Sequence, residues 1–263
     1  MQNLNPQRIR ATAVVSFAAL FFSTVFETRA MIKHVSMIDP PVPLAQFDPW
    51  YQAVHAMECM NLFGPWMRRY VSWRARVPCP DAQARNYYPG RYTEIWYDSV
   101  EAFREANPFG RSYSSAPWPG GLSRSDHATA RLLIPAMPTE DFLGKPAPTV
   151  SSKPFRWLFM LGYPEGVDAA KADEWYLKVH TQEAKNLPGL LRYVSYHAVP
   201  NSPLRSQYVR MSEMWFKDYD SYLQATSTRK FQYTKAPWVK GNEPWFVIAS
   251  VFLDYDPDLV FIK

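Results

Sequence analysis

The sequence WYQAVHAMECMNL, residues 50–62, occurs a second time in this chain as WYLKVHTQEAKNL, residues 175–187. Seven of the thirteen positions are identical at an offset of 125, far more than chance would produce. The repetition continues downstream: RYVS at residues 69–72 returns at 192–195, and the spaced Arg, Glu and Trp of 91–96 return at 210–215. Internal repetition over such a span predicts a duplicated domain.

The identical positions share one face if the stretch is a helix. At about 100° per residue, all seven fall within an arc of about 140° that begins at Trp50. This face carries apolar side chains and is expected to pack inward, yet each copy also places a histidine and a glutamate on it. His55 and Glu58, like His180 and Glu183, are three residues apart and are therefore neighbours on a helix.

A histidine beside a carboxylate in an aromatic wall suits general acid–base catalysis. We therefore predict that His55, His180, Glu58 and Glu183 are catalytic, and the alternative is that each histidine is a structural residue at the edge of the core. Retention of the pair in both copies favours the catalytic interpretation.

The amino-acid composition limits the classes of function that this protein can have. The chain has 263 residues, 47% of them hydrophobic and 16% aromatic, which suits a large core and pockets for flat apolar ligands. Its net charge of +5 is spread along the chain without a basic run, so neither nucleic-acid binding nor stable membrane association is expected. Cys59 and Cys79 belong to no metal-ligand pattern, and so we expect no metal, no disulfide framework and a cytoplasmic location.

Residues 1–30 differ from the rest of the chain. A basic start, an uncharged run over 11–26 and small residues before position 31 are typical of a secretory signal, which would mean export. The alternative is that Met31 is the true start and that the leader lies outside the natural protein. Under either interpretation these residues are not expected to belong to the fold.

The remaining chain predicts two units with the same order of elements. Residues 31–137 form repeat 1, the proline-rich segment 138–154 forms a linker, and residues 155–263 form repeat 2. Each repeat is predicted to be β-α-β-β-α-β, a ferredoxin-like order, with a long helix at 44–62 in repeat 1 and at 168–186 in repeat 2. The fold class is α+β, with the two repeats packed sheet against sheet.

The run Leu187-Pro188-Gly189-Leu190, followed by Arg192 and Tyr193 after the helix histidine, resembles the EthD-like family of dimeric α/β-barrel proteins. In that superfamily two ferredoxin-like units form one barrel, usually as a homodimer. The resemblance implies an intramolecular dimeric α/β barrel here, either monomeric or further assembled. It also implies a pocket between the sheet and the helices, in which the helix histidine acts as acid or base. His34 on the first strand is similar to the strand histidine of some barrel cyclases, and repeat 2 is expected to have Phe159 at that position.

The other shared side chains of the helix face, with His34, are expected to bind the substrate: Trp50, Tyr51, Asn61, Trp175, Tyr176, Asn186.

Glu94 and Glu213 each precede a tryptophan by two residues on a predicted strand. They either face the helix histidine, where they could orient it or take a proton, or face the partner sheet and pair with an arginine, Arg69/Arg192 or Arg91/Arg210.

We expect a cofactor-independent lyase or isomerase that acts on a small aromatic, quinone or lactone-like compound. Dehydration, decarboxylation and isomerisation all begin with removal of a proton next to a carbonyl, which a His/Glu pair can perform. The alternatives are a haem-binding or cofactor-free monooxygenase of the same superfamily, and a small-molecule binding protein without catalytic activity.

Overall fold

The computed structural model describes residues 30–76, 86–111, 118–121, 128–227 and 233–262. It confirms an α+β fold in which each repeat is a ferredoxin-like β-α-β-β-α-β unit. The strands within each repeat pair antiparallel, in the order β2-β3-β1-β4 in repeat 1 and β7-β8-β6-β9 in repeat 2. Most of the leader, together with Cys79 and His127, lies outside the described residues.

The elements of repeat 1 are β1 Ile32–Asp39, α1 Leu44–Trp50, a π-helical turn Tyr51–His55, α2 Ala56–Phe63, β2 Met67–Arg74, β3 Arg91–Tyr97, α3 Val100–Ala106 and β4 Ala128–Pro135. Those of repeat 2 are β6 Phe155–Gly162, α4 Ala169–Trp175, a π-helical turn Tyr176–His180, α5 Thr181–Ala184, β7 Leu190–His197, β8 Arg210–Phe216, α6 Tyr219–Ser227 and β9 Val247–Leu253. Single 3-10 turns lie at Pro119–Gly121 and Val150–Ser152.

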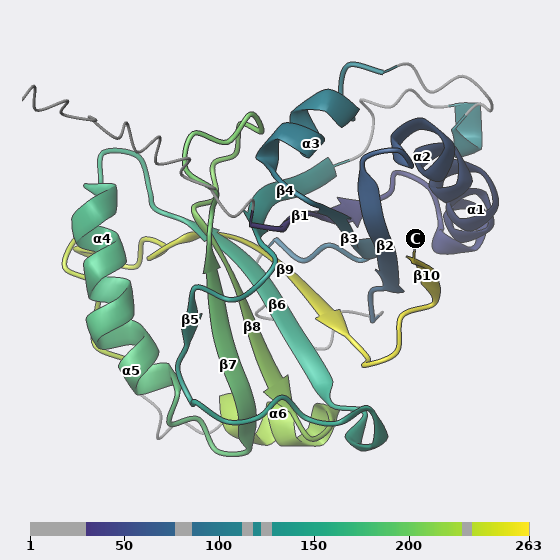
Figure 1. Ribbon diagram of the computed structural model, residues 1–263. Coiled ribbons are helices and arrows are strands. Elements are labelled where there is room, and N and C mark those ends of the chain that lie inside the picture. The colour runs from purple at the N-terminus through teal and green to yellow at the C-terminus, as the bar shows by residue number, and fades with distance from the viewer. Residues whose placement is uncertain (1–29, 77–85, 112–117, 122–127, 228–232, 263) are drawn as a thin grey trace, which may run out of the picture.

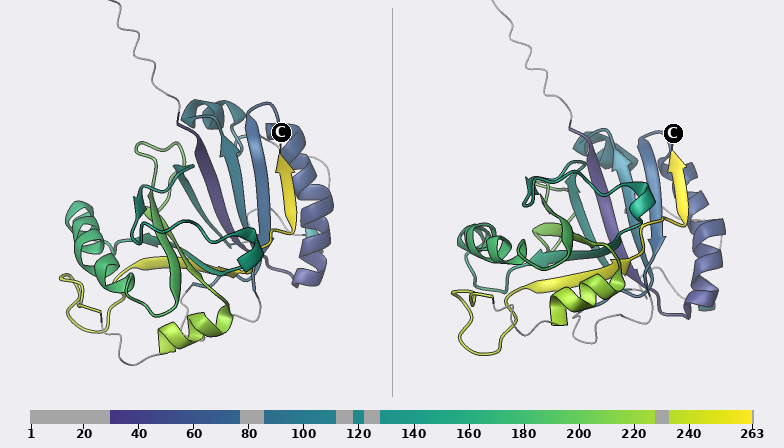
Figure 2. Two further views of the ribbon diagram at one scale, coloured as in Figure 1. Left: turned by 60° about the horizontal axis from the view of Figure 1, so that its bottom comes forward. Right: turned by 90° about the horizontal axis from the view of Figure 1, so that it is seen from below.

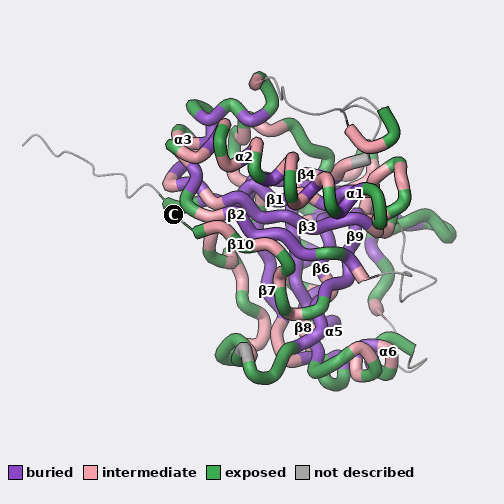
Figure 3. The backbone as a smooth tube through the Cα atoms, turned by 90° about the vertical axis from the view of Figure 1, so that its right-hand side faces the viewer, coloured by how far each residue is buried: buried purple, intermediate pink, exposed green. Residues whose placement is uncertain are grey.

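The two sheets face each other and bury a common core, while the helices cover their outer faces (Figure 1). Alternation along the strands explains this arrangement, since Val35 and Met37 of β1 point to the partner sheet and His34 and Ser36 point to the helices. Figure 3 shows the buried strands at the centre of the molecule and the exposed turns of the helices outside them.

Each sheet is extended by one short strand from outside its repeat. β5, Glu140–Asp141, lies in the segment expected as a linker and pairs with β7 of repeat 2. β10, Leu259–Ile262, follows β9 and pairs with β2 of repeat 1. Figure 2 shows β10, in yellow, at the edge of the first sheet. Each sheet therefore has five strands: the linker contributes the edge strand of the second sheet, and the end of repeat 2 contributes the edge strand of the first.

The long helix of each repeat is interrupted by a π turn at the same place. Tyr51–His55 and Tyr176–His180 occupy equivalent positions, each beginning at the shared tyrosine and ending at the shared histidine. Such turns are rare and occur often at functional sites. Within the described part of the chain, no helix is long and apolar enough to cross a membrane.

Candidate functional site

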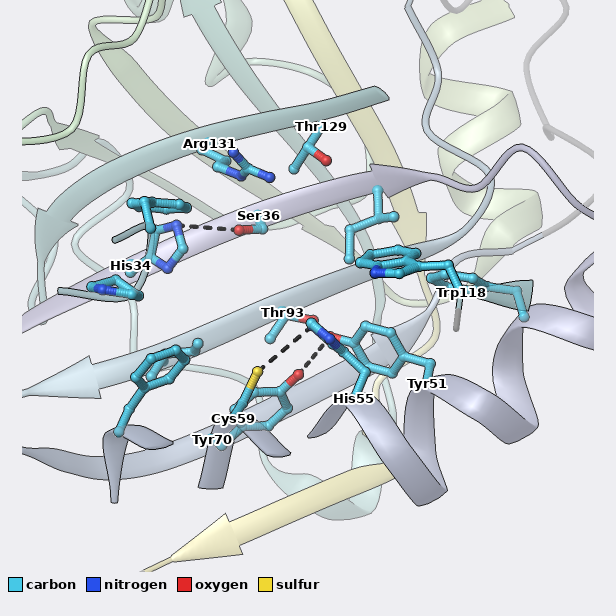
Figure 4. Close-up of a pocket in the computed structure, with 16 residues that line it drawn as sticks. His34, Ser36, Tyr51, His55, Cys59, Tyr70, Thr93, Trp118, Thr129 and Arg131 are labelled. Atoms are coloured by element: carbon cyan, nitrogen blue, oxygen red, sulfur yellow. Dashed lines mark hydrogen bonds between the residues drawn. The ribbon is translucent and has the colours of Figure 1, made fainter. Parts of the chain in front are cut away.

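A small pocket lies between the sheet and the long helix of repeat 1 and has a cavity volume of about 60 Å³. We call it the repeat 1 pocket. Its polar lining comes from both sides, since His34, Ser36, Thr129 and Arg131 lie on strands and His55 lies on the helix (Figure 4). Aromatic rings fill much of the remaining wall: Phe47, Tyr51, Phe63, Tyr70, Phe109, Trp118.

The imidazole of His55 is held by its own helix and by two indoles. Nε2 lies 3.6 Å from the thiol of Cys59, one turn further along, within hydrogen-bonding distance for sulfur. Trp50 stacks on the ring at a centroid distance of 5.3 Å, and Trp118 packs against it at 5.6 Å. These contacts fix the orientation of the ring, which is a requirement for proton transfer to a bound substrate.

The π turn determines which side chains reach the pocket after His55. A π turn contains one residue more than an α turn, so each later position is turned back by about 100°. Cys59 therefore takes the direction that uniform α-helical spacing assigns to Glu58, and it is buried and lines the pocket. Glu58 is half-buried and is not part of the described lining.

The same rotation removes the two asparagines from the predicted site. Asn61 and Asn186 are exposed, and neither contributes to a described pocket wall. The side-chain amide of Asn186 instead donates to the carbonyl oxygen of Gln182 at 2.8 Å.

His34 lies on β1, on the wall opposite His55 (Figure 4). It is 5% exposed, and its Nε2 is 3.3 Å from the hydroxyl of Ser36. The rings of Phe103 and Phe109 pack against it at centroid distances of 5.6 Å and 5.4 Å. Two histidines from different elements thus contribute to one pocket.

A buried hydroxyl network lies beneath the helix in both repeats. The hydroxyl of Tyr51 is 2.6 Å from the hydroxyls of both Tyr70 and Thr93. In repeat 2 the hydroxyl of Tyr176 lies 3.0 Å from that of Tyr193 and 2.8 Å from that of Ser212. Burial raises the pKa of both Tyr51 and Tyr176, so these phenols remain protonated and hold the π turn on the sheet.

Repeat 2 has a wider hollow of about 1340 Å³ beside His180. Tyr233 packs on His180 at a centroid distance of 4.8 Å, and Trp175 and Tyr176 stack on it at 5.7 Å and 5.6 Å. Burial lowers the pKa of His180 to about 4, although nearby Glu183 opposes the shift, so His180 is neutral at physiological pH.

The described hydrogen bonds of Glu183 go to the segment that covers His180 and not to the imidazole itself. The carboxylate accepts hydrogen bonds from the backbone nitrogen of Thr234 at 2.8 Å and from the hydroxyl of Thr234 at 2.5 Å. Thr234 follows Tyr233, and so this contact positions the tyrosine over the imidazole.

The strand register shows that the two pockets are chemically different. His34 pairs with Ile95 and Trp157 pairs with Met214, so Trp157 is the counterpart of His34. The expectation that Phe159 replaces His34 was wrong by two residues, because Phe159 is the counterpart of Ser36. The sheet wall of the repeat 2 hollow is consequently apolar at these two positions, which Trp157 and Phe159 occupy.

Glu94 and Glu213 lie between the two sheets, and they do not face the helix histidines. Their partners are not the arginines expected from the sequence: Glu94 lies 3.7 Å from Lys33, and Glu213 lies 3.2 Å from Arg156. The indoles of Trp96 and Trp215 donate to the two carboxylates at 3.1 Å and 3.0 Å. Burial opposes ionisation of Glu213, but Arg156 and Lys33 outweigh it and hold the pKa below its ordinary value.

The arginines expected to pair with Glu94 and Glu213 make other contacts. The guanidinium groups of Arg69 and Arg192 pack on Trp96 and Trp215 at 5.7 Å and 5.5 Å.

Arg91 and Arg210 each link the long helix of their own repeat to the segment that carries the added edge strand, since Asp258 directly precedes β10 and Glu140 lies in β5. Arg91 binds Asp48 at 2.9 Å and Asp258, while Arg210 binds Asp173 at 2.5 Å and Glu140 at 2.7 Å. The sequence analysis missed this pair of clusters. The signal was present, because Asp48 and Asp173 match at the same offset of 125, two residues before the shared tryptophan.

Arg131 and the contribution of Cys59 were not predicted from the sequence. Repeat 2 has Ser250 and Ala184 at the equivalent positions, so neither the guanidinium nor the thiol is repeated. Among the described residues, no group of three or more His, Cys, Asp or Glu side chains is arranged to hold a metal ion.

Comparison by sequence finds no matching protein family and no similar curated protein. Solved structures do match. An anthrone oxidase-like protein superposes with a TM-score of 0.54 and 9% identity, covering 90% of this chain and 94% of its own. An EthD family protein from Bacillus halodurans C-125 shares 26% identity over 29% of this chain and 74% of its own, with a TM-score of 0.26. A chlorite dismutase from Candidatus Nitrospira defluvii has a TM-score of 0.41 and 8% identity, over 86% and 91%.

The first of these matches spans both repeats, and at its identity it is evidence about the fold. It agrees with the facing sheets, the outer helices and the strand order described above. This chain therefore has a dimeric α/β-barrel fold, with both halves of the barrel in one polypeptide.

Proposed function

We propose that this protein is an enzyme that performs acid–base chemistry on a small aromatic, quinone or lactone-like compound in the repeat 1 pocket. The observation that carries the proposal is the placement of His34 and His55, which contribute to one aromatic pocket from opposite walls. Two imidazoles on opposite sides of a flat ligand can remove a proton at one position and return it at another.

His55 is the base in this proposal. One of its ring nitrogens takes a proton from a carbon or hydroxyl next to the substrate carbonyl, and the stacking of Trp50 keeps the ring in place. His34 then returns a proton to the opposite face for an isomerisation, or to a leaving hydroxyl for a dehydration. The surrounding rings provide the flat apolar walls that aromatic ligands require.

Repeat 2 has a supporting role in this proposal. His180 is neutral, but the histidine on the opposite wall is replaced by Trp157, so the described lining of the hollow has one imidazole where that of the repeat 1 pocket has two. Glu58 and Glu183 act through the helix and the covering segment, and they do not take protons from the substrate.

A second candidate is a cofactor-free monooxygenase, which the likeness to an anthrone oxidase-like protein favours. It shares the first step, because removal of a proton from an aromatic ketone by His55 leaves an electron-rich carbon that reacts with dioxygen. One oxygen atom enters the product as a carbonyl, and the other leaves as water.

Haem is the cofactor of one alternative interpretation, in which a helix histidine such as His180 would hold it. A metal-bound histidine normally donates its other ring nitrogen to an acceptor. Nδ1 of His180 is buried and has no hydrogen-bond partner among the described residues. His180 therefore fits the function of an axial ligand poorly.

The test is a turnover screen with the purified full-length chain, using aromatic hydroxy acids, quinones, lactones and anthrones, with oxygen uptake recorded in parallel. Turnover that His55→Ala abolishes, without oxygen uptake, supports the lyase or isomerase. Turnover with stoichiometric oxygen uptake supports the monooxygenase. An absorption band of bound haem in the protein as purified, or turnover unchanged in both His55→Ala and His34→Ala, contradicts the proposal.

A further inference from the structure

The charge of the repeat 1 pocket is one-sided. Its described lining contains Arg131, His34 and His55, and it contains no aspartate, glutamate or lysine. The arginine keeps its positive charge at any pH at which the protein is folded. An aromatic pocket that contains a guanidinium favours a ligand with a negative group.

Arg131 is placed for such contact by the sheet. It lies on β4 directly opposite Ser36 of β1 and two residues from Thr129, so all three side chains share the face that points to the helix. The guanidinium packs on the ring of Phe109 at 5.0 Å, and the edge of that ring meets His34. The charge therefore lies on the same wall as His34, across the pocket from His55 (Figure 4).

This charged corner belongs to repeat 1 alone. In repeat 2 the pair equivalent to Ser36 and Arg131 is Phe159 and Ser250, as the strand registers show. The large side chain of this pair is Arg131 on β4 in repeat 1 and Phe159 on β6 in repeat 2, so the pair in repeat 2 carries no charge. The repeats thus keep a common hydroxyl network and helix histidine while the sheet walls differ, which is the pattern expected where one pocket has acquired its own ligand specificity.

We propose that the ligand of the repeat 1 pocket is an aromatic compound with an anionic oxygen group, a carboxylate or a phenolate, and that Arg131 binds this group. This inference rests on the proposed function in that it assigns the substrate class of the same pocket. Guanidinium forms paired hydrogen bonds to carboxylates and also binds single phenolate oxygens. Binding the anion on the His34 wall places the rest of the ring toward His55.

The experiment measures binding of unreactive probes to the full-length chain by calorimetry. The probes are benzoate, 4-nitrophenolate and the uncharged benzamide. The variants are Arg131→Gln, Arg131→Ser, which copies repeat 2, and Arg68→Gln as the control, because Arg68 is an exposed arginine paired with Asp98 at 2.8 Å.

Wild-type protein and Arg68→Gln should bind at least one of the two anions more tightly than benzamide. Arg131→Gln and Arg131→Ser should bind that anion about 10- to 100-fold more weakly, with benzamide unchanged, since a hydrogen bond to a charged group contributes about that much. A preference for benzoate identifies a carboxylate ligand, and a preference for 4-nitrophenolate identifies a phenolate ligand.

Equal binding of the anions and benzamide by the wild type, or no measurable binding of either anion, overturns the inference without any variant. Unchanged anion binding in Arg131→Gln overturns it as well. The proposed function fails separately: anion binding that depends on Arg131, together with the absence of turnover in the screen, supports the ligand class and contradicts the enzyme.

Discussion

Replacement of Glu213 by glutamine should strongly destabilise the protein, because this carboxylate balances a buried charge. The Glu213 side chain is 3% exposed and lies 3.2 Å from the guanidinium of Arg156, which is 7% exposed. Glutamine keeps the volume and can still accept the hydrogen bond from Trp215, so the change isolates the charge. Removing one partner of a buried ion pair costs about 3–5 kcal/mol.

The neighbouring pair of Lys33 and Glu94 has no net charge. In the Glu213→Gln variant this pair therefore does not balance the positive charge of Arg156. At about 2–4 °C per kcal/mol for a chain of this size, the expected decrease in Tm is roughly 6–20 °C. Urea titrations of Glu213→Gln should give the loss in free energy of unfolding directly.

Two further variants make the reasoning refutable. Asp256→Asn removes an exposed pair with Lys153, whose atoms are 2.7 Å apart, and should cost no more than about 1 kcal/mol. The double variant Arg156→Met/Glu213→Gln removes both charges and should be clearly more stable than the sum of the single changes predicts. A Glu213→Gln variant within about 1 kcal/mol of wild type, or strict additivity in the double variant, would refute the account of this cluster.

Two further predictions concern the helix of each repeat. Acidification should reduce stability through His180. Burial holds the pKa of His180 in the folded protein at about 4, below the value of 6.5 in the unfolded chain. As the pH falls between these two values, the unfolded chain binds the proton and the folded protein does not, so the unfolded state is favoured. The loss is on the order of 3 kcal/mol and should appear as a difference in urea midpoints, at pH 7 and pH 4, between wild type and His180→Phe; the same pH dependence in both proteins would contradict it. Cys59→Ala should fold with a loss of about 1 kcal/mol, since repeat 2 has Ala184 at this position, and should reduce kcat less than His55→Ala does. A Cys59→Ala variant as inactive as His55→Ala would mean that the thiol takes part in the chemistry.

The sequence was sufficient for the features that depend on local pattern and on repetition. The shared run around His55 and His180 predicted the duplication, and the order of elements predicted for each repeat, β-α-β-β-α-β, is the observed order. Such patterns depend on a few neighbouring residues, so they can be recognised without knowledge of the fold.

The added edge strands could not be predicted in this way. β5 and β10 are two and four residues long, and each pairs with a strand far away in the sequence, β7 for the linker strand and β2 of repeat 1 for β10. Nothing within Glu140–Asp141 distinguishes it from a loop until the edge of β7 is known.

The site was only partly predictable because two small shifts rearranged it. The π turn at Tyr51–His55 rotated Cys59 into the pocket and Asn61 out of it. A two-residue error in strand alignment hid the correspondence of Lys33 with Arg156, which are the true partners of the buried glutamates. A slip of two residues preserves the face of a strand but changes every neighbour on it.

The most direct test of the central claim, that the repeat 1 pocket is the working site, compares the turnover of His55→Ala and His180→Ala on the substrate that the screen identifies. The account predicts that His55→Ala lowers kcat by about 10²- to 10⁴-fold, as loss of a general base does, while His180→Ala retains a rate close to wild type. A wild-type rate in His55→Ala, or an equal loss in His180→Ala, would contradict it.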